Sequence, residues 1–459
     1  MPRMKYTLAK RIYWYLRRYP AQPVLDFLEE SQWWPRERLE ALRNNKLRAL
    51  IEHCYAHVPY YRKVMDARRL KPGDFTSVRD LTKLPVLTKD LVRQNLSKLW
   101  ADNIPAHKTH EARTGGTTGE PMRIRRWPPD VAWQTQCYAR ELSWGGLGVN
   151  QPRISLFGGS LGQPEPQTLR GRLAKFSKRK NLFLPAFELG PHNVADYAKK
   201  IQASPARHLL GYASAVYLLA FLTEEAGLSL HLDTVYPTAE LLPDAWRNKI
   251  TAVFSCKVLP YYGCGEVNSL GYQCGEGEGY HRPDEHAIME ALSEDGTTSF
   301  EGSGAFLVTD LDNHAMPILR YKNGDAGVLG DAPCPCGRTL GRILELHGRV
   351  NDMLLTTENI PISGVIATYA LQRWVRGVKF FQFVQDRPGQ IRVRIVPTSE
   401  YHRDVEEKRL REILRKHLGE SAEITFEYPE DIERTPAGKA RFVINHWLTQ
   451  KTDRAAGPP

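Results

Sequence analysis

Hydrophobic positions recur at helical spacing through the first hundred residues. One such helix face carries Leu47, Leu50, Ile51 and Cys54. Pro59 interrupts this pattern, and Thr88 stands at the N-cap position of another short helix. The pattern therefore predicts a mainly helical region over 1–100, with a strand over Met122–Trp127 after it.

The period then alternates between strand and helix from about residue 130 to 262. The expected strands are Arg153–Phe157, His208–Leu210, Thr234–Pro237 and Lys257–Tyr261. The expected helices are roughly Asp130–Trp144, Val194–Gln202, Ala213–Ala226 and Pro243–Phe254. Such alternation indicates a largely parallel sheet with helices on both faces, and ligands bind such sheets beyond the carboxyl ends of the strands.

Short strand patterns dominate 267–347, at Ala305–Thr309, Met316–Tyr321 and Ala326–Leu329. A compact α+β unit follows, with a helix near Ile366–Val375, a hairpin through Phe380–Val396, a helix over His402–His417 and a strand over Glu423–Tyr428. We expect an α/β protein with a large N-terminal domain over 1–347, which combines doubly wound mixed sheets with a β-rich part. A small α+β C-terminal domain would cover 353–450, after a linker over 348–352, and 451–459 would be a disordered tail.

Composition is that of a globular protein with anionic partners. The 459 residues suggest two or three domains, and 42% of them are hydrophobic and 25% charged. The formal net charge of +11 favours nucleotides, coenzymes, nucleic acid or a membrane surface as partners. Tyr6–Arg18 is compatible with a basic amphipathic helix on a membrane surface, although packing against the body of the protein is the favoured interpretation.

The cysteine content and the apolar runs indicate the compartment. Seven cysteines in a chain of this length do not make a disulfide framework. The basic N-terminus lacks the apolar core of a signal peptide, and the longest apolar run, Tyr212–Leu222, is too short to span a bilayer. We expect a reduced, cytoplasmic protein without a transmembrane segment, either a monomer or a homodimer.

One stretch concentrates glycine and threonine: Thr114–Pro121 has the sequence Thr-Gly-Gly-Thr-Thr-Gly-Glu-Pro. Glycine lets the backbone approach a ligand closely, and consecutive N–H groups can form an anion-binding nest. The stretch lacks the Gly-Lys-Ser/Thr ending of a Walker A loop. A phosphate-binding loop and a surface turn are both compatible with it.

Further stretches carry chemistry for a nucleotide. Thr238–Glu240 and Tyr262–Glu266 both follow expected strands, so both would face one cleft, where an aromatic ring can stack on a base and a carboxylate can hold magnesium. Asp325, at the end of Arg320-Tyr321-Lys322-Asn323-Gly324-Asp325, suits the hydroxyls of a ribose. Lys439 on a glycine-containing turn suits a phosphate or carboxylate whose charge rises during reaction. Singly, each also fits a turn cap, a core tyrosine or a surface lysine.

In this order the stretches resemble the adenylate-forming (acyl-coenzyme A synthetase) superfamily, and specifically its phenylacetate–coenzyme A ligase branch with the CapK-like capsule-biosynthesis relatives. The superfamily motifs stand here as Thr114–Gly119, Thr238–Glu240, Tyr262–Glu266, Arg320–Asp325, Gly348–Asp352 and Gly438–Lys439. Leu47–Arg62 and Leu84–Lys89 suggest the branch. The resemblance covers almost the whole chain.

The resemblance implies ATP, magnesium and coenzyme A as cofactors and assigns the nucleotide contacts. The pyrophosphate part of ATP would be held by Thr114, Gly115, Gly116, Thr117, Thr118 and Gly119. The adenine side would be formed by Ala239, Glu240, Tyr261, Tyr262 and Gly263. Asp325, with Arg349, would hold the ribose.

It also implies the catalytic residues. Glu266 would assist magnesium, and Lys439 would bridge the carboxylate and the α-phosphate during adenylation. Asp352 would be the hinge on which the small, mobile C-terminal domain rotates between two half-reactions. The sequence departs from the superfamily at Gly115, Gly265 and Thr238, which stand where a hydroxyl residue, a Ser or Thr, and a glycine are usual. These departures remove no charged group that the chemistry needs.

A zinc site is predicted in an insertion over about 268–340. Cys334 and Cys336 form a Cys-x-Cys pair, and Cys274 and His281 precede it. Three thiolates and one imidazole make the closed tetrahedral set of structural zinc, and the same branch often carries this pattern. His286 is the competitor to His281. We interpret Cys54, Cys137 and Cys256 as core residues and expect Cys264 near the nucleotide.

The sequence therefore predicts ATP-dependent activation of a small organic acid, such as an aromatic acid, to an acyl-adenylate with pyrophosphate release. Transfer to coenzyme A would follow; an amine, a hydroxyl or a carrier-protein thiol is the alternative acceptor. A basic zinc protein that binds nucleic acid is the non-enzymatic alternative, but the ordered ATP motifs argue against a nucleic-acid partner. Candidates for the acid pocket are Trp133, Tyr138, Phe157 and Tyr236.

Overall fold

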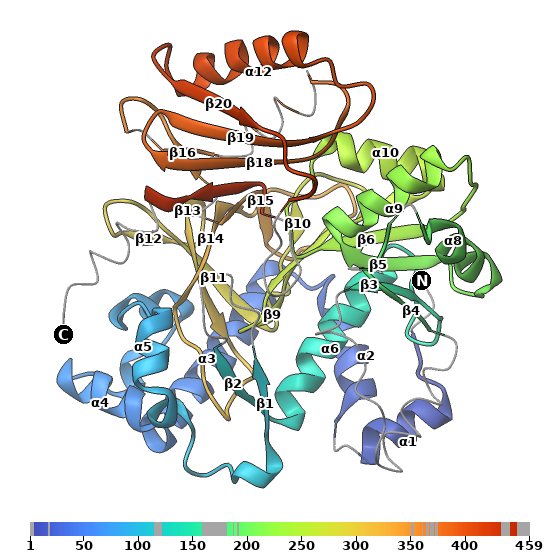
Figure 1. Cartoon of the computed structure of the whole chain (residues 1–459). Helices are drawn as coiled ribbons and strands as arrows, with labels where there is room; N and C mark the ends of the chain where they lie inside the picture. The colour runs from blue at the N-terminus through green and yellow to red at the C-terminus, as the bar shows by residue number, and fades with distance from the viewer. Residues whose placement is uncertain are drawn as a thin grey trace.

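The computed structural model describes most of the chain. The described residues are 4–16, 19–113, 122–157, 181–186, 188–190, 192–349, 353–359, 361–363, 367, 371, 375–432 and 441–447. Figure 1 shows N-terminal helices at the bottom of the view, two larger sheets in the middle, and a C-terminal α+β unit at the top. The predicted tail over 451–459 lies outside the described residues.

The N-terminal region is helical, as predicted. Its elements are α1 (Leu8–Leu16), α2 (Ala21–Ser31), α3 (Arg36–His57), α4 (Pro59–Ala67), α5 (Lys89–Gln94) and the 3₁₀ turns η1 (Pro72–Asp74), η2 (Val78–Lys83), η3 (Leu96–Leu99) and η4 (Ala106–Lys108). Val58 is extended and ends α3, and Pro59 opens the next helix, α4, at a position where its missing N–H is not needed. Thr88 caps α5 as predicted, because its Oγ1 accepts a 3.3 Å hydrogen bond from the Leu91 N–H.

Two short strands flank the glycine- and threonine-rich stretch. They are β1 (His110–Arg113) and β2 (Arg123–Arg126), which pair antiparallel with Arg113 opposite Arg123. The second agrees with the strand predicted over Met122–Trp127. The stretch itself, Thr114–Pro121, lies outside the described residues.

The alternating segment forms a parallel sheet with the order β4-β3-β5-β6-β7. Its strands are β3 (Ile154–Phe157), β4 (Leu182–Pro185), β5 (His208–Tyr212), β6 (Thr234–Thr238) and β7 (Lys257–Val258), and the helices nearby are α6 (Pro128–Ser143), α8 (Val194–Ala203), α9 (Ala213–Glu225) and α10 (Asp244–Phe254). Val235 packs in the cluster that contains α9 and α10, whereas its neighbour Tyr236 packs with Leu142 of α6. Because successive strand residues point to opposite faces, helices cover both faces, as predicted.

The second sheet is largely antiparallel and has the order β12-β11-β13-β14-β15-β10-β9-β8. Its strands are β8 (Tyr261–Cys264), β9 (Asn268–Tyr272), β10 (Tyr280–His281), β11 (Ala287–Leu292), β12 (Thr298–Ser299), β13 (Gly302–Asp310), β14 (Tyr321–Gly330) and β15 (Arg342–Arg349). The predicted strand over Met316–Tyr321 is wrong. That apolar run is buried but belongs to no strand before Tyr321, and β14 begins only after Arg320, whose φ of 52° is left-handed.

The predicted strand over Lys257–Tyr261 is also wrong in its extent. Lys257 and Val258 end the parallel sheet as β7, and Tyr261 already belongs to β8 in the other sheet. The chain therefore changes sheets at Leu259–Pro260. Proline has no N–H for the hydrogen bonds between strands, which is consistent with the position of Pro260 where the chain passes from one sheet to the other.

The C-terminal part is a separate α+β unit. It contains the pair β16 (Met353–Leu355) and β17 (Pro361–Ser363), and a sheet of the order β20-β19-β18-β21 with helix α12 (Arg403–Leu418). The strands of this sheet are β18 (Val378–Arg387), β19 (Gln390–Pro397), β20 (Glu423–Glu427) and β21 (Val443–Asn445). The predicted hairpin, charged helix and final strand are confirmed, whereas most of the helix predicted near Ile366–Val375 lies outside the described residues.

An aromatic contact joins this unit to the parallel-sheet part. Trp246 of α10 stacks on Tyr217 of α9 at 4.4 Å between ring centroids, and meets Phe442 edge-on at 4.9 Å. Of the stretch predicted as the linker, Gly348 and Arg349 are the last residues of β15, and 350–352 lie outside the described residues.

Candidate functional site

Residues predicted to bind the nucleotide lie at the end of β6, in and after β8, and in β14 and β15. The described members of the set are Ala239, Glu240, Tyr261, Tyr262, Gly263, Glu266, Asp325 and Arg349. The members outside the described residues are Thr114, Gly115, Gly116, Thr117, Thr118, Gly119, Asp352 and Lys439. The roles of this second group stay predictions.

The turn after β6 is held at both ends. Thr238 Oγ1 donates a 3.0 Å hydrogen bond to the Tyr261 carbonyl, which ties the end of β6 to the start of β8. Ala239 has a left-handed φ of 70°, a conformation that is uncommon outside glycine. A carboxylate oxygen of Glu240 accepts a 2.7 Å hydrogen bond from the Ser214 N–H in the first turn of α9, where the helix dipole favours negative charge.

The two tyrosines of β8 point to different surroundings. Tyr261 stacks on Tyr272 with 5.4 Å between centroids and meets Tyr138 edge-on at 5.4 Å. Tyr262 packs into the core under the antiparallel sheet and is 8% exposed. Gly263 follows where a Cβ would lie only 3.2 Å from the Asn268 carbonyl carbon, so the tight turn into β9 favours a glycine.

A hydrogen-bond cluster joins β8 to β14. The Tyr262 hydroxyl donates to Asp325 Oδ2 at 2.7 Å and accepts from Asn323 Nδ2 at 2.7 Å. The Asn323 amide oxygen accepts from the Asp325 N–H at 3.0 Å. Burial, and then the Asp325 carboxylate, raise the pKa of Tyr262 well above its ordinary value, so Tyr262 remains a neutral donor. In the ladder, Asp325 stands opposite Arg349.

The Glu266 carboxylate is buried and held by a neighbouring tyrosine. Its Oε1 accepts a 3.2 Å hydrogen bond from the Tyr321 hydroxyl, which comes from the first residue of β14. Its main-chain carbonyl accepts from the Arg126 guanidinium. The next carbonyl, of Val267, lies 3.2 Å from His286 Nε2. Both the side chain and the backbone of this turn are therefore fixed.

Behind this turn lies a buried ionic network that the sequence analysis missed. Arg126 pairs with Asp310 at 3.0 Å, His286 Nδ1 with Asp312 at 2.7 Å, and Lys46 with Asp312 at 2.5 Å. His286 is therefore not the competitor for the zinc site that the sequence suggested. Nothing in the spacing of these residues could have revealed the network, because its members come from four distant stretches and charge alone does not predict burial.

Three of the four acid-pocket candidates meet. Tyr138, Phe157 and Tyr236 belong to one cluster with Tyr261. The fourth candidate, Trp133, lies elsewhere, so its prediction is wrong. Its ring faces α2 and α3: it meets Phe27 at 5.6 Å between centroids, and the Lys46 ammonium group lies 3.7 Å from the ring centroid. The cluster lies where α6 crosses β5 and β6, which fits the predicted position beside the turns after β6 and in β8.

Arg320 of the Arg-Tyr-x-x-Gly-Asp stretch has a structural role. Its guanidinium binds the Glu290 carboxylate through Nε at 3.0 Å and Nη2 at 2.9 Å, and both side chains are buried. The backbone of Leu87 bridges to Tyr321, with Leu87 N–H to Arg320 carbonyl at 3.0 Å and Lys322 N–H to Leu87 carbonyl at 2.9 Å. Two motif stretches that are far apart in the sequence therefore meet beside Asp325.

The predicted zinc ligands form one cluster. The ligand atoms of Cys274, His281, Cys334 and Cys336 all lie within 4.8 Å of one another. Cys274 Sγ is 3.6 Å from Cys334 Sγ, and Cys336 Sγ is 3.3 Å from His281 Nε2. A Cβ at position 277 would lie 3.0 Å from Cys334 Sγ, so Gly277 permits this approach. Three sulfurs and one imidazole nitrogen in this arrangement fit a tetrahedral zinc ion.

The acid–base properties of the histidine suit a ligand. Burial, and then the nearby Arg338 and Arg342, lower the pKa of His281 to about 4, which keeps the imidazole neutral. The other cysteines behave as predicted for core residues: Cys54, Cys137 and Cys256 are buried, and burial raises the pKa of each thiol. Cys264 ends β8 beside Tyr262, and its thiol pKa is also raised by burial.

Comparison with known proteins gives relatives and a fold. Residues 354–446 match the family described as the CapK C-terminal domain. The chain is 26% identical to the protein CapK of Staphylococcus aureus over 410 residues, which cover 88% of this chain and 89% of that protein. It is 24% identical to a phenylacetate–coenzyme A ligase of Thermus thermophilus over 455 residues, which cover 92% of this chain and 99% of the relative.

A solved structure shares the architecture. 2-Hydroxyisobutyryl-CoA ligase in the postadenylation state aligns with a TM-score of 0.73 at 17% identity, covering 93% of this chain and 95% of that one. The comparisons confirm the predicted resemblance and the predicted α/β fold with its C-terminal α+β domain. In the described part of the chain, no helix has the length and hydrophobicity to cross a bilayer.

Proposed function

The chain is related to CapK and to the phenylacetate–coenzyme A ligases over most of its length, and from this we propose that it is an AMP-forming acid–coenzyme A ligase. It would activate a small carboxylic acid with ATP and transfer the acyl group to coenzyme A. The observation that carries the proposal is the 2.7 Å hydrogen bond between Tyr262 and Asp325. It joins a residue predicted at the adenine to one predicted at the ribose, 63 positions apart.

In this proposal, Asp325 accepts hydrogen bonds from the ribose hydroxyls, and Arg349, opposite it in the ladder, lies beside the same sugar. Glu266 would hold magnesium, which would neutralise phosphate charge. Each carboxylate already accepts a hydrogen bond from a tyrosine, Tyr262 or Tyr321. Fixed partners of this kind reduce the reorganisation that binding requires.

The chemistry explains why a lysine is needed. A carboxylate oxygen attacks the α-phosphorus of ATP, a new P–O bond forms, and the bond to pyrophosphate breaks. Two anions approach each other in this step, so a positive charge that is present only in the transition state lowers the barrier. We assign this charge to Lys439. The thiol of coenzyme A then attacks the acyl carbon, and AMP leaves.

The aromatic cluster supports a small or aromatic acid as the substrate. Tyr138, Phe157, Tyr236 and Tyr261 gather beside the proposed adenine turn. The Tyr236 hydroxyl donates to the Leu142 carbonyl at 2.7 Å and the side chain is buried, so Tyr236 serves the fold and supports its partly buried neighbours Tyr138, Phe157 and Tyr261. Aromatic walls with few polar groups are typical of pockets for small organic molecules.

Carboxylate-dependent ATP–pyrophosphate exchange tests the proposal. We expect exchange with at least one aromatic or short-chain acid from a panel, and a thioester in the mass spectrum when coenzyme A is added. An adenylate that hydroxylamine traps, without any thioester, would instead favour an amine, hydroxyl or carrier-protein acceptor. Absence of exchange with every acid, in a protein that binds ATP, would contradict adenylation.

We also propose that Cys274, His281, Cys334 and Cys336 hold a structural zinc ion. The support is their donor set and their mutual separation of less than 4.8 Å. The ligands come from the loop just after β9, from β10, and from the segment between β14 and β15. A metal ion there would tie these segments together in place of a larger hydrophobic core.

A further inference from the structure

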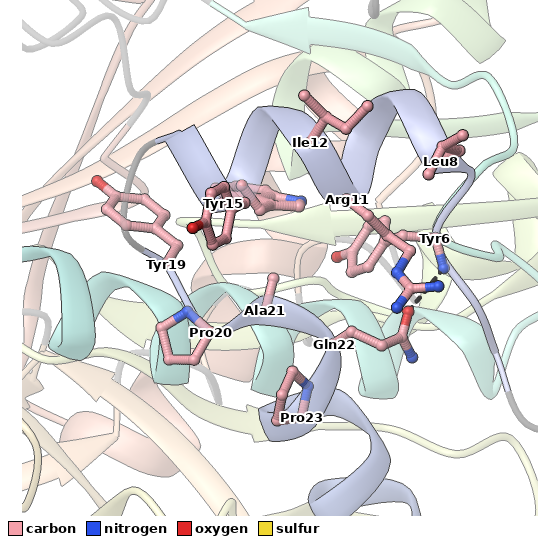
Figure 2. Close-up of a pocket in the computed structure, with 11 residues that line it drawn as sticks. Tyr6, Leu8, Arg11, Ile12, Tyr15, Tyr19, Pro20, Ala21, Gln22 and Pro23 are labelled. Atoms are coloured by element: carbon pink, nitrogen blue, oxygen red, sulfur yellow. Dashed lines mark hydrogen bonds between the residues drawn. The ribbon is translucent and has the colours of Figure 1, made fainter.

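Helix α1 carries an exposed apolar stripe on the outside of the molecule. Leu8, Ile12 and Tyr15 are 71%, 50% and 81% exposed. Their spacing of four and three residues places them on one face of the helix. Figure 2 shows Ile12 on the side of α1 away from Pro20 and Pro23, and Leu8 at the start of the helix. Large exposed apolar side chains are rare in the described part of this protein, and three of the five found there belong to α1.

The stripe is not the result of a loosely attached helix. Tyr6, just before α1, donates a 2.7 Å hydrogen bond to Gln136 of α6, and Lys10 donates one of 2.6 Å to the Val149 carbonyl. Trp14, on the other side of α1, packs edge-on against Tyr6 and stacks on Tyr19. Among the described residues, the inner face of α1 is therefore packed, while the side chains of Leu8, Ile12 and Tyr15 on its outer face stay exposed.

An aromatic hollow lies beside the stripe. Its volume is about 470 Å³, and its lining includes Trp14, Tyr19, Pro20 and Pro23 together with the stripe residues Leu8, Ile12 and Tyr15 (Figure 2). Tryptophan and tyrosine are enriched at membrane–water interfaces, because their rings are apolar and their polar groups can stay hydrated. The hollow therefore extends the apolar stripe with residues suited to the same environment.

The charges on α1 and just before it have one sign, and the nearby acidic groups of α2 already accept hydrogen bonds: Asp26 from Gln22 and Glu29 from the Met4 N–H. Among described residues 4–16, Lys5, Lys10 and Arg11 are basic and none is acidic. Lys5 and Arg11 are exposed. The chain contains no aspartate or glutamate before Asp26. A second copy of this surface would bring like charges together, whereas anionic headgroups complement them.

We propose that α1 is an interfacial helix that lies on the surface of an anionic membrane. Leu8, Ile12 and Tyr15 enter the boundary between headgroups and acyl chains, and Lys5 and Arg11 remain with the phosphates. Figure 1 places α1 at the opposite end of the molecule from the C-terminal unit, so membrane contact leaves that unit accessible. The inference does not depend on the proposed enzymatic activity.

Vesicle cosedimentation of the full chain tests the proposal. We expect binding to vesicles of phosphatidylcholine mixed with phosphatidylglycerol, and at least about tenfold weaker binding to phosphatidylcholine alone. Added salt should weaken the binding. The variant Leu8→Ser/Ile12→Ser/Tyr15→Ser should lose at least about tenfold in affinity, and Lys5→Gln/Arg11→Gln should lose affinity for anionic vesicles only. Val405→Ser, which changes an exposed residue of α12, is the matched control and should bind as the wild type does.

The stripe residues are exposed, so the triple variant should keep the melting temperature of the wild type. Binding that survives in the folded triple variant, or equal binding to both kinds of vesicle, would overturn the proposal. Dimerisation that the triple variant abolishes, without vesicle binding by the wild type, would also overturn it and assign the stripe to a second copy of the chain.

Discussion

The hydroxyl of Tyr262 lies between Asn323 and Asp325 and orients the carboxylate that we assign to the ribose. It accepts from Asn323 Nδ2 and donates to Asp325 Oδ2, each at 2.7 Å. The two carboxylate oxygens of Asp325 are therefore not equivalent. Oδ2 accepts hydrogen bonds from both Tyr262 and Asn323, which fixes the rotation of the carboxylate.

Tyr262→Phe should weaken ATP binding by about tenfold, because a lost hydrogen bond to a charged group costs about 1.5–3 kcal/mol, shared between folding and binding. Isothermal titration calorimetry with ATP measures the change. Tyr60→Phe, the same substitution on α4, is the control. Equal ATP affinity in both variants would contradict the orienting role.

Arg140 is a buried cation that joins α6 to two other parts of the chain. It bonds Glu285 at 2.7 Å, Glu141 at 2.9 Å and the Leu28 carbonyl at 3.0 Å. Arg140→Ala leaves the buried Glu285 carboxylate without its cation, so the free energy of unfolding should fall by about 3–5 kcal/mol. Lys200→Ala, which breaks an exposed pair with Asp196, should cost less than about 1 kcal/mol. Urea unfolding compares the two, and similar losses would contradict the assignment.

His286 should make stability depend on pH. Burial lowers its pKa, but Asp310 and Asp312 outweigh burial, so the pKa of His286 is raised above its ordinary value in the folded protein. A histidine whose pKa is raised by folding contributes its full stabilisation at pH values below the unfolded pKa of about 6.5. This contribution to the free energy of unfolding is lost as the pH rises through the folded pKa.

The difference in unfolding free energy between wild type and His286→Gln should therefore shrink as the pH rises above about 6.5. Lys46, Arg126 and Asp130 also face this network, so the comparison with the variant, rather than the wild-type curve alone, isolates the histidine. Urea titrations at several pH values measure it. A difference that grows with pH would show that His286 is neutral in the folded protein.

Elemental analysis tests the zinc site. We expect one zinc ion per chain in the purified protein and none in Cys334→Ser/Cys336→Ser. The double variant should also melt at a lower temperature, since β10 and the segment before β15 lose their link. Cys256→Ala, at a buried cysteine outside the cluster, is the control and should keep its zinc. Zinc retained in the double variant, or absent from the wild type, would refute the assignment.

Local sequence patterns predicted many of the helices and strands, but few of the contacts between residues far apart in the sequence. The alternation around Thr234–Pro237 gave a correct strand because the period of two and the adjacent helices agree. The strand prediction over Met316–Tyr321 was wrong, because this run is hydrophobic as part of the buried core and not as part of a strand. A short apolar run does not distinguish the two.

The candidate site shows the same limit. Motif order singled out Tyr262, Asp325 and the four proposed zinc ligands, and the structure brings each group together, but the sequence did not predict the hydrogen bonds that these residues make. His286 appeared in the sequence only as an alternative metal ligand. Its true partner, Asp312, lies 26 positions away across a β-strand pair, and such a contact depends on sheet register that sequence spacing does not provide.

Lys439 provides the most direct test of the adenylation step. If it meets the reacting groups only in the transition state, Lys439→Ala should retain ATP binding and lose about 100–1,000-fold in carboxylate-dependent pyrophosphate exchange. Exchange at saturating ATP and acid separates the two effects, because a residue that binds the ground state would raise KM instead. Lys408→Ala, on the exposed face of α12 in the same domain, controls for the loss of a positive charge. Wild-type exchange in Lys439→Ala would remove the lysine from the mechanism, and the rising charge would then have to be offset by groups of the N-terminal domain alone.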